Sequence, residues 1–281
     1  DIMIVYHHDD LDGITSAAII NYTMRDKNAK YYAVNYGDTW NLDEVKDEVV
    51  YVVDFSFPDM QLLNDSCKQL IWIDHHKTAM EKQAVAWNNP DIDGERSLDY
   101  AGCELTWRYM APTTLMPKII QHVGDIDMWE FTLKDTIPIA EAANIELTTY
   151  DNPMWLRLFN PNFQRHQLDI LLERGKILLT AKDLRINKGF KSGTDIRFKG
   201  LKVKIVNATS DMSEIGQKIY ESGYDIAIVW RYVNDKVVVS FRSNRVAVDK
   251  IAQEFGGGGH KYAAGATLTM EQLIELYKMV I

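Results

Sequence analysis

The stretch "YHHDDLDGITSAA", residues 6–18, places two histidines and three aspartates within six positions, followed by a glycine and several small residues. Carboxylates this close together repel one another unless a positive charge or water lies among them. Asp10 and Asp12 are two residues apart, so both can project to one side of a strand end. Gly13 then permits a tight turn into a following helix. The stretch therefore indicates either a metal site or a solvated turn with an aspartate helix cap.

Short apolar runs alternate with helical patterns through the first half of the chain. The runs "IMIVY" (2–6), "VVYVVDF" (49–55) and "LIWIDHH" (70–76) have the length and composition of buried strands. Residues 13–25 and 59–69 have helical spacing. This alternation predicts an α/β fold, with a parallel sheet covered by helices on both faces. Each run ends in acidic or imidazole side chains, at the sheet edge where such folds bind ligands.

The second half begins with helices and ends in a different pattern. Residues 163–190 fit one long helix, and strands rich in Val and Ile follow at 201–208, 224–233 and 236–243, with helices between and after them. We place a domain boundary in "NKGFKSGTD", between Asn187 and Asp195. The predicted domains are residues 1–187, which include a linker helix, and a smaller α/β domain at 195–281.

Composition narrows the function classes. The chain has 281 residues, a formal net charge of −9 and a sequence pI of about 5.3. This acidic balance disfavours a protein that grips long nucleic acid, and favours a short phosphate substrate or a local basic patch. Cys67 and Cys103 are the two cysteines, which is typical of a reduced, cytoplasmic protein. We expect no membrane partner, because no run of about 18 apolar residues occurs.

Acidic and imidazole side chains recur at several points along the chain. Asp54 ends one predicted strand, the sequence "DHH" (74–76) ends another, and "HVGDIDMWEF" contributes His122, Asp125 and Asp127. Each cluster alone fits a cap, a turn or a loop. Together, His and Asp ligands without cysteine favour Mn²⁺, Mg²⁺ or Fe²⁺, with Zn²⁺ as a further option. Two ions sharing a carboxylate would relieve the repulsion and suit phosphoryl transfer.

The motifs "HHDDLDG", "VVDFS", "IDHH" and "HVGDID" resemble, in this order, the four motifs of the DHH phosphoesterase superfamily. The segment "FGGGGHKYAAGA" (255–266) resembles the glycine-rich signature of the DHH-associated substrate-binding domain. The superfamily includes RecJ-like exonucleases, oligoribonucleases, cyclic-dinucleotide phosphodiesterases and family II inorganic pyrophosphatases. The resemblance covers most of the chain, and the glycine-rich signature argues against the pyrophosphatase branch.

The resemblance implies a centre of two metal ions, usually Mn²⁺, with Mg²⁺ or another divalent ion as an alternative. Asp54 would bridge the two ions. The implied ligands are His8, Asp10, Asp12, Asp54, His75 and Asp125. His76 would contact the substrate phosphate, and Asp74 would support a ligand from behind.

One position departs from the family pattern. Many members have a histidine four residues before the first aspartate of the pair, where this chain has Tyr6. His8 matches a variant pattern, and His7 is the competing assignment. In the fourth motif the family's residue is the first acid after the small residue, which favours Asp125 over Asp127.

The glycine-rich end adds a second candidate site. Consecutive glycines can present backbone N–H groups to an anion, and an arginine at a strand end can pair with a phosphate. The alternative is a helix cap followed by a flexible loop. The predicted substrate-binding residues are Arg242, Gly257, Gly258, Gly259 and His260. Trp129, beside the fourth motif, is a candidate for base stacking or for the core.

These patterns lead to one functional prediction and two alternatives. We expect a two-metal phosphodiesterase that hydrolyses short oligonucleotides, or linear or cyclic dinucleotides, to nucleoside monophosphates. One alternative is a RecJ-like exonuclease on single-stranded DNA. The other is a non-catalytic protein that binds or sequesters nucleotides. The sequence leaves the exact substrate, the native metal and the oligomeric state open, with a homodimer among the options.

Overall fold

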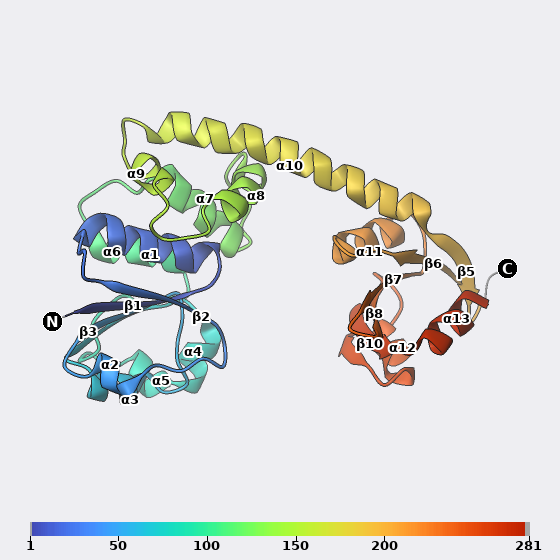
Figure 1. Ribbon diagram of the computed structural model, residues 1–281, viewed down its shortest axis with the longest axis horizontal. Coiled ribbons are helices and arrows are strands. Elements are labelled where there is room, and N and C mark those ends of the chain that lie inside the picture. Colours follow the sequence, from blue (N-terminus) through green and yellow to red (C-terminus); the bar gives the residue numbers. More distant parts are fainter. Residues whose placement is uncertain (1, 279–281) are drawn as a thin grey trace. The chain divides into compact units, whose positions relative to one another are not determined.

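The computed structural model describes residues 2–278 and divides the chain into two compact units, Asp1–Leu178 and Leu179–Ile281 (Figure 1). The division falls inside helix α10 (Gln164–Ser192), earlier than the boundary expected between Asn187 and Asp195. The reason lies in the packing of this helix. Its first half buries Leu171 in the core of the first unit, and its last turns place Phe190 against the core of the second.

The first unit is built on a four-stranded parallel sheet with the order β2-β1-β3-β4. The strands are β1 (Met3–His8), β2 (Lys30–Val34), β3 (Val49–Val53) and β4 (Gln69–Ile73). The predicted parallel sheet is therefore confirmed. Strand β2 did not stand out in the sequence, because this edge strand is mostly half-exposed and carries no long apolar run.

Helices cover both faces of this sheet, as the alternating pattern predicts (Figure 1). Side chains of successive strand residues point to opposite faces. On one face of the sheet, Val5 of β1 packs with Ala17 and Leu105. On the other face, Tyr6 of β1 belongs to the same apolar cluster as Met60 and Trp72.

The helices on the Val5 face are α1 (Leu11–Met24) and α6 (Gly102–Met110), with α7 (Lys118–Asp127), α8 (Thr136–Glu146) and α9 (Met154–Leu158) packed beyond them. The helices on the Tyr6 face are α2 (Leu42–Val45), α3 (Met60–Ser66), α4 (Lys77–Lys82) and α5 (Ala84–Trp87).

The turn from β1 into α1 explains the glycine of the opening stretch. Asp10 is the N-cap of α1, and its carboxylate accepts a hydrogen bond from the Gly13 amide at 2.9 Å. A Cβ atom on residue 13 would lie 2.2 Å from the carbonyl oxygen of His8. Only glycine therefore lets the first helical turn approach the strand end so closely.

The second unit contains a six-stranded mixed sheet with the order β5-β6-β7-β8-β10-β9. Only β6 and β7 pair in parallel; the other neighbouring strands are antiparallel. The strands are β5 (Thr194–Phe198), β6 (Leu201–Asn207), β7 (Ile226–Val233), β8 (Lys236–Arg242), β9 (Gly258–His260) and β10 (Ala263–Leu268).

Helix α11 (Met212–Glu221) and the end of α10 cover one face of this second sheet. Helices α12 (Val248–Glu254) and α13 (Met270–Lys278) pack on the apolar cluster of the other face. The second unit is thus an α/β domain, as expected from the sequence.

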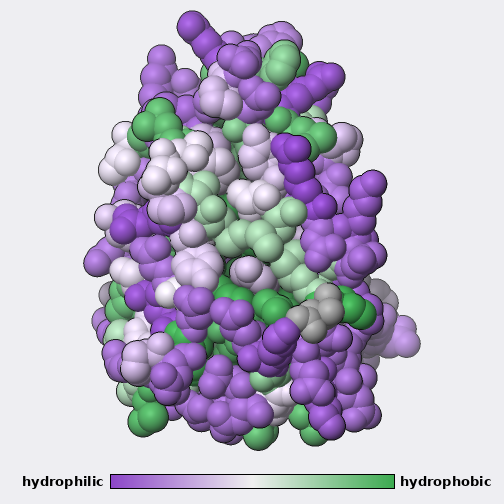
Figure 2. Space-filling model, turned by 90° about the vertical axis from the view of Figure 1, so that its left-hand side faces the viewer, coloured by the Kyte–Doolittle hydropathy of each residue, from purple (hydrophilic) through white to green (hydrophobic). Residues whose placement is uncertain are grey.

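One face of the molecule is mostly hydrophilic. Figure 2 shows this face, with paler and hydrophobic residues near its middle and hydrophilic residues around them. Among the helices in residues 2–278, none combines the length and the apolar character that a membrane-spanning segment needs.

Candidate metal centre

Polar side chains from the ends of β1, β3 and β4 come together at one edge of the first sheet. They form three groups whose potential ligand atoms lie within 4.8 Å of one another. The groups are Asp54 with His75 and His76, His8 with Asp10 and Asp54, and Asp12 with His75 and Asp127. Because Asp54 and His75 each belong to two groups, the three form one continuous cluster.

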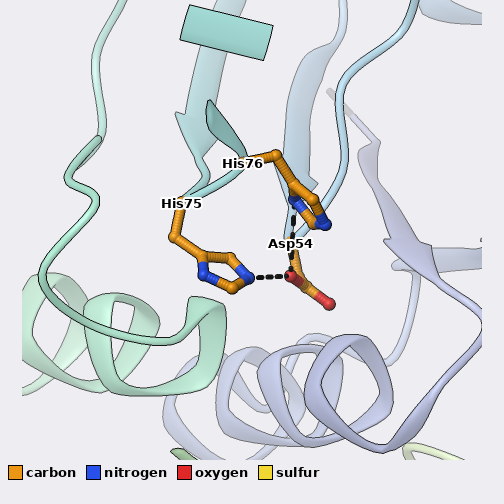
Figure 3. A group of neighbouring side chains, drawn as sticks. All are labelled: Asp54, His75 and His76. Carbon is orange, nitrogen blue, oxygen red and sulfur yellow. Dashed lines mark hydrogen bonds and ion pairs between the residues drawn. The ribbon is translucent and has the colours of Figure 1, made fainter. Parts of the chain in front are cut away.

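Asp54 lies at the middle of this cluster. In Figure 3, His75 and His76 extend from the end of β4 toward its carboxylate. The His75 Nε2 atom is 3.1 Å from Asp54 Oδ1, and the His76 Nδ1 atom is 3.9 Å from the same oxygen. Asp54 has a φ of 53°, a left-handed conformation that is uncommon for a residue other than glycine.

The environment of Asp54 is unfavourable for a bare carboxylate. The residue is 1% exposed, and its Oδ2 atom is buried without a hydrogen-bond partner among the described residues. Burial, together with the nearby charges of Asp12 and Asp10, raises the pKa of Asp54 well above its ordinary value. A cation at this oxygen would satisfy the atom and balance the charges.

The first motif contributes His8 rather than His7. The His8 Nδ1 atom lies 2.6 Å from Asp10 Oδ2, and the His8 ring stacks on Phe55 with centroids 5.9 Å apart. His7 is the preceding strand residue, which places its side chain on the opposite face. Its Nδ1 atom is bonded to the His8 carbonyl oxygen at 2.8 Å. The geometry favours His8 as the ligand.

The N-terminus of α6 holds Asp12 in place. The amides of Gly102 and Cys103 donate to the two carboxylate oxygens of Asp12, each at 2.7 Å. A Cβ atom on residue 102 would lie 2.6 Å from the Cβ atom of Asp54. Gly102 therefore allows the helix to approach both aspartates, a role that sequence reasoning did not identify.

Asp127, not Asp125, is the fourth-motif carboxylate that joins the cluster. Asp127 Oδ2 lies 3.4 Å from His75 Nε2. Burial raises the pKa of Asp127 to about 7, and the charges of Asp12 and Asp10 add to this effect. Two residues along an α-helix are separated by about 200°, so the two aspartates point in different directions.

Asp125 instead organises the loop after α7. Its carboxylate accepts hydrogen bonds from the Thr132 amide at 2.7 Å, the Leu133 amide at 3.2 Å, and the hydroxyls of Thr132 and Thr136. Asp125 lies outside the three donor groups, whereas Asp127 belongs to one of them, so the geometry favours Asp127 over the expected Asp125. The two threonines within eleven residues were the only signal in the sequence for the role of Asp125 in the loop.

His76 is oriented by the aspartate that precedes the two histidines. The His76 Nδ1 atom lies 2.7 Å from Asp74 Oδ1, which leaves Nε2 as the ring nitrogen available to a ligand. Burial lowers the pKa of His76, but the bond and the charge of Asp74 outweigh it, so the pKa is raised. Asp74 is buried and lies outside the three donor groups, which suits a supporting residue rather than a ligand.

The predicted substrate-binding residues of the second unit share one end of its sheet. Arg242 of β8 pairs with Ala263 of β10, and Ala263 pairs with His260 of β9. Side chains of directly paired residues lie on the same face, so Arg242 and His260 flank a small alanine. The Arg242 guanidinium also donates to the Ser213 hydroxyl at 3.4 Å, in the first turn of α11.

The four glycines do not form the flexible loop that was the alternative interpretation of the sequence. Gly258 and Gly259 belong to the edge strand β9, and the Gly257 amide donates to the Ala252 carbonyl. A Cβ atom on residue 257 would lie 2.1 Å from the Gly265 carbonyl oxygen. Gly259 has a φ of 142°, and a Cβ atom on this residue would lie 2.6 Å from the Cα atom of Ala264. Close packing on β10 accounts for at least these two glycines.

The residues of the first unit fit a divalent-metal site. Oxygen and imidazole donors without thiolates suit Mn²⁺ and related ions, and the buried Asp54 oxygen lacks any other partner in the described chain. Burial and the crowding of these donors raise the pKa of both Asp54 and Asp127, and a bound cation would relieve the repulsion.

Two family models match the chain, in the same order as its two units. The model described as "DHH family, N-terminal domain" matches residues 1–128, and "DHHA1 domain" matches residues 199–281. The first match contains the whole cluster, and the second contains Arg242 and the glycine-rich strand. The chain belongs to the DHH phosphoesterase superfamily.

Two relatives of this DHH protein cover almost all of its length. "Uncharacterized protein R106" of Acanthamoeba polyphaga mimivirus is 27% identical over 94% of this chain and 66% of its own. "Oligoribonuclease NrnB" of Bacillus subtilis is 23% identical over 97% of this chain and 74% of its own. This chain therefore spans only about two thirds to three quarters of the relatives.

A solved structure supports the fold of the DHH protein. The "pGpG-specific phosphodiesterase - PggH" of Vibrio cholerae has a TM-score of 0.53 and 13% identity, covering 99% of this chain and 97% of its own. At this identity the likeness shows the fold alone. Members of the superfamily are phosphoesterases, and the DHH protein is accordingly a phosphoester hydrolase.

Proposed function

We propose that this DHH protein is a two-metal phosphodiesterase that cleaves short oligonucleotides, or linear or cyclic dinucleotides, to nucleoside monophosphates, with Mn²⁺ as its metal. The observation that carries the proposal is the position of Asp54. It is shared by donor groups on both sides, and one of its buried oxygens has no protein partner within the described residues. The names of the B. subtilis and V. cholerae proteins point to the same substrate class.

The proposed ligands divide into two sets around Asp54. His8, Asp10 and Asp54 would hold one ion, and Asp12, Asp54, His75 and Asp127 the other. When bound, two divalent ions lower the pKa of water and neutralise charge on a phosphate. The amides of Gly102 and Cys103, at the N-terminus of α6, hold the Asp12 carboxylate in a fixed position.

His76 is the proposed proton carrier at the leaving oxygen. The Asp74 carboxylate accepts a hydrogen bond from the His76 Nδ1–H group and so fixes the ring orientation. The Nε2 atom is left to contact a phosphate oxygen or to protonate the departing alcohol. In the second unit, Arg242 and His260 supply donors for a substrate phosphate. The acidic net charge is compatible with a short substrate that needs few such contacts.

A substrate panel tests the proposal. Purified protein with Mn²⁺ is incubated with a short RNA ladder, linear dinucleotides, cyclic dinucleotides and long single-stranded DNA. We expect nucleoside monophosphates from one or more of the short substrates, and loss of turnover in Asp54→Ala and His75→Ala.

Three results would contradict parts of the proposal. Cleavage of long single-stranded DNA alone would favour a RecJ-like exonuclease. Tight nucleotide binding without product would favour a non-catalytic binding protein. Full activity in Asp54→Ala would refute the assigned centre.

A further inference from the structure

A small pocket lies beside the candidate metal centre, and none of its residues belongs to the proposed ligand set. Its volume is about 220 Å³, and Phe55, Phe57, Pro58 and Ala79 supply apolar wall. Sites for drug-sized ligands have roughly 300–1,000 Å³. The pocket therefore has room for one ring system, and is too small for a whole dinucleotide.

Tyr36 connects this pocket to the centre. Its ring centroid lies 5.6 Å from that of His8, 5.7 Å from that of Phe55 and 6.4 Å from that of His76. The side chain is nevertheless 66% exposed. An aromatic ring in contact with a proposed metal ligand and with the proposed proton carrier is well placed to touch a bound substrate.

The backbone around Tyr36 presents the ring rather than burying it. The Asp38 amide donates to the Asn35 carbonyl at 3.0 Å, and the Asn35 amide donates to the Asp38 carboxylate at 2.7 Å. Gly37 has a φ of 105°, as the third residue of a tight turn often requires. Tyr36 is thus the second residue of a closed turn, held at a fixed place with its side chain outward.

The polar groups of the pocket suit the edge of a flat, neutral ring. Ser56 and Thr78 contribute hydroxyls, and Lys82 contributes an ammonium group from the last turn of α4. The side-chain amide of Gln83 already has partners within the fold. Its Nε2 atom donates to the Phe57 carbonyl at 2.7 Å, and its Oε1 atom accepts from the Met60 amide at 2.8 Å. Mostly apolar walls disfavour a phosphate, whose charge would lose its hydration.

We propose that this pocket binds one nucleobase of the substrate, the base of a nucleoside next to the scissile phosphate, with Tyr36 as its stacking surface. The inference rests on the proposed function and names a subsite for it. Aromatic side chains stack on any base, because every base has a π-face. The pocket would thus select for a nucleoside beside the phosphate without strongly selecting its identity.

The test combines a protein variant with a substrate change. Wild type, Tyr36→Ala and Tyr36→Phe are assayed with Mn²⁺ on a 5′-phosphorylated RNA dinucleotide and on two analogues, each abasic at one position. Phe163→Ala, which truncates another exposed aromatic of the same unit, is the matched control. Bis(p-nitrophenyl) phosphate, a diester without bases, reports on the metal centre of the wild type.

At one of the two positions, removing the base should lower the wild-type kcat/KM by roughly 5- to 160-fold, the range of one base–aromatic stack. On the intact dinucleotide, the kcat/KM of Tyr36→Ala should fall below that of the wild type by a similar factor. On that abasic analogue, the variant and the wild type should have nearly the same kcat/KM. Tyr36→Phe and Phe163→Ala should behave as wild type. Equal losses of Tyr36→Ala on intact and abasic substrates would overturn the inference, as would a wild type indifferent to both bases. If the wild type hydrolyses no diester at all, the proposed function itself fails.

Discussion

At the scale of single residues, the two aspartates of the fourth motif, Asp125 and Asp127, have different surroundings. Asp127 faces His75, whereas Asp125 accepts four hydrogen bonds from residues 132–136. The family position favoured Asp125, whose carboxylate accepts hydrogen bonds from the following loop. The donors that occupy Asp125 become visible only when the loop is folded back on α7.

Replacement of these two aspartates should therefore have different effects. Asp127→Asn should reduce Mn²⁺-dependent turnover by more than about 100-fold, the upper range for residues that merely support a ligand, with a small change in melting temperature. Asp125→Asn should lower the free energy of unfolding by about 1–3 kcal/mol, because its buried donors lose a charged acceptor. Turnover assays and denaturant melts decide, and the reverse pattern would show that Asp125 is the ligand.

We expect the effect of Asp54→Asn on the melting temperature to have opposite signs in the metal-free and the metal-loaded protein. In chelator, Asp54→Asn should melt at a higher temperature than wild type, because the change removes a buried charge near Asp10 and Asp12. At about 100 times the dissociation constant, Mn²⁺ should stabilise the wild type by ~2.7 kcal/mol, and the variant far less. Thermal melts with and without Mn²⁺ measure both effects.

Asp9 supplies the control for this experiment. It belongs to the same acidic stretch but lies outside the three ligand groups and is exposed. Asp9→Asn should keep the wild-type response to Mn²⁺. A metal response lost in Asp9→Asn and retained in Asp54→Asn would contradict the assignment.

At the scale of elements, the N-terminus of α6 is part of the centre. Gly102→Ala would place a Cβ atom 2.6 Å from the Asp54 Cβ atom and 2.9 Å from its Oδ1 atom. We expect a loss of about 1–3 kcal/mol from overpacking, together with weaker Mn²⁺ stabilisation as Asp12 loses its amide donors. Wild-type melting and metal response in this variant would show that α6 does not support the site.

An ion pair in the second unit gives a prediction about pH. Lys204, 6% exposed, bonds Asp195, and this bond outweighs burial and holds the pKa of the Asp195 carboxyl below its usual value. A carboxyl whose pKa is lowered by folding stabilises the fold at a pH above its pKa in the unfolded chain. This stabilisation is lost as the pH falls through its pKa in the folded protein. Asp195→Asn should therefore be less stable than wild type at pH 6.

The difference between these two proteins should shrink as the pH falls from about 5 to 3, because the unfolded pKa of aspartate is near 3.9. Chemical melts across this range measure it, with Asp183→Asn on the exposed side of α10 as a control. A difference that stays constant down to pH 3 would mean that the pair contributes nothing through its charge.

The elements that the sequence predicted are those with strong patterns. Strands β1, β3 and β4, their parallel pairing and the long helix α10 all follow from runs of apolar residues or from helical spacing. The strands β5, β9 and β10 did not emerge, because β9 and β10 are rich in glycine and alanine and β5, with the sequence TDIRF, has no apolar run. Pairing with β8 makes β10 a strand, and local propensity does not record that contact.

The candidate site was predictable to the same extent. Strand ends that carry Asp or His, together with the resemblance to the DHH superfamily, pointed to His8, Asp10, Asp12, Asp54 and His75, which the structure brings together. Gly102 and Tyr36 lay outside the prediction because their roles arise from tertiary contacts: a helix terminus that meets two aspartates, and a turn that reaches two histidines.

At the scale of the whole molecule, the proposed metal ligands and the proposed phosphate contacts lie in different units. The first unit holds every proposed metal ligand and the Tyr36 pocket, and the second holds Arg242 and His260. The family matches divide the chain in the same way. The acidic charge of the whole chain suits a small anionic substrate whose recognition depends on a few placed donors.

Anomalous diffraction from a crystal of the protein grown with Mn²⁺ tests the central claim most directly. The account predicts two manganese peaks roughly 3.5–4 Å apart, with the Asp54 carboxylate between them, His8 on one ion and His75 with Asp127 on the other. A single peak, or a pair of ions that leaves Asp54 uncoordinated, would contradict it.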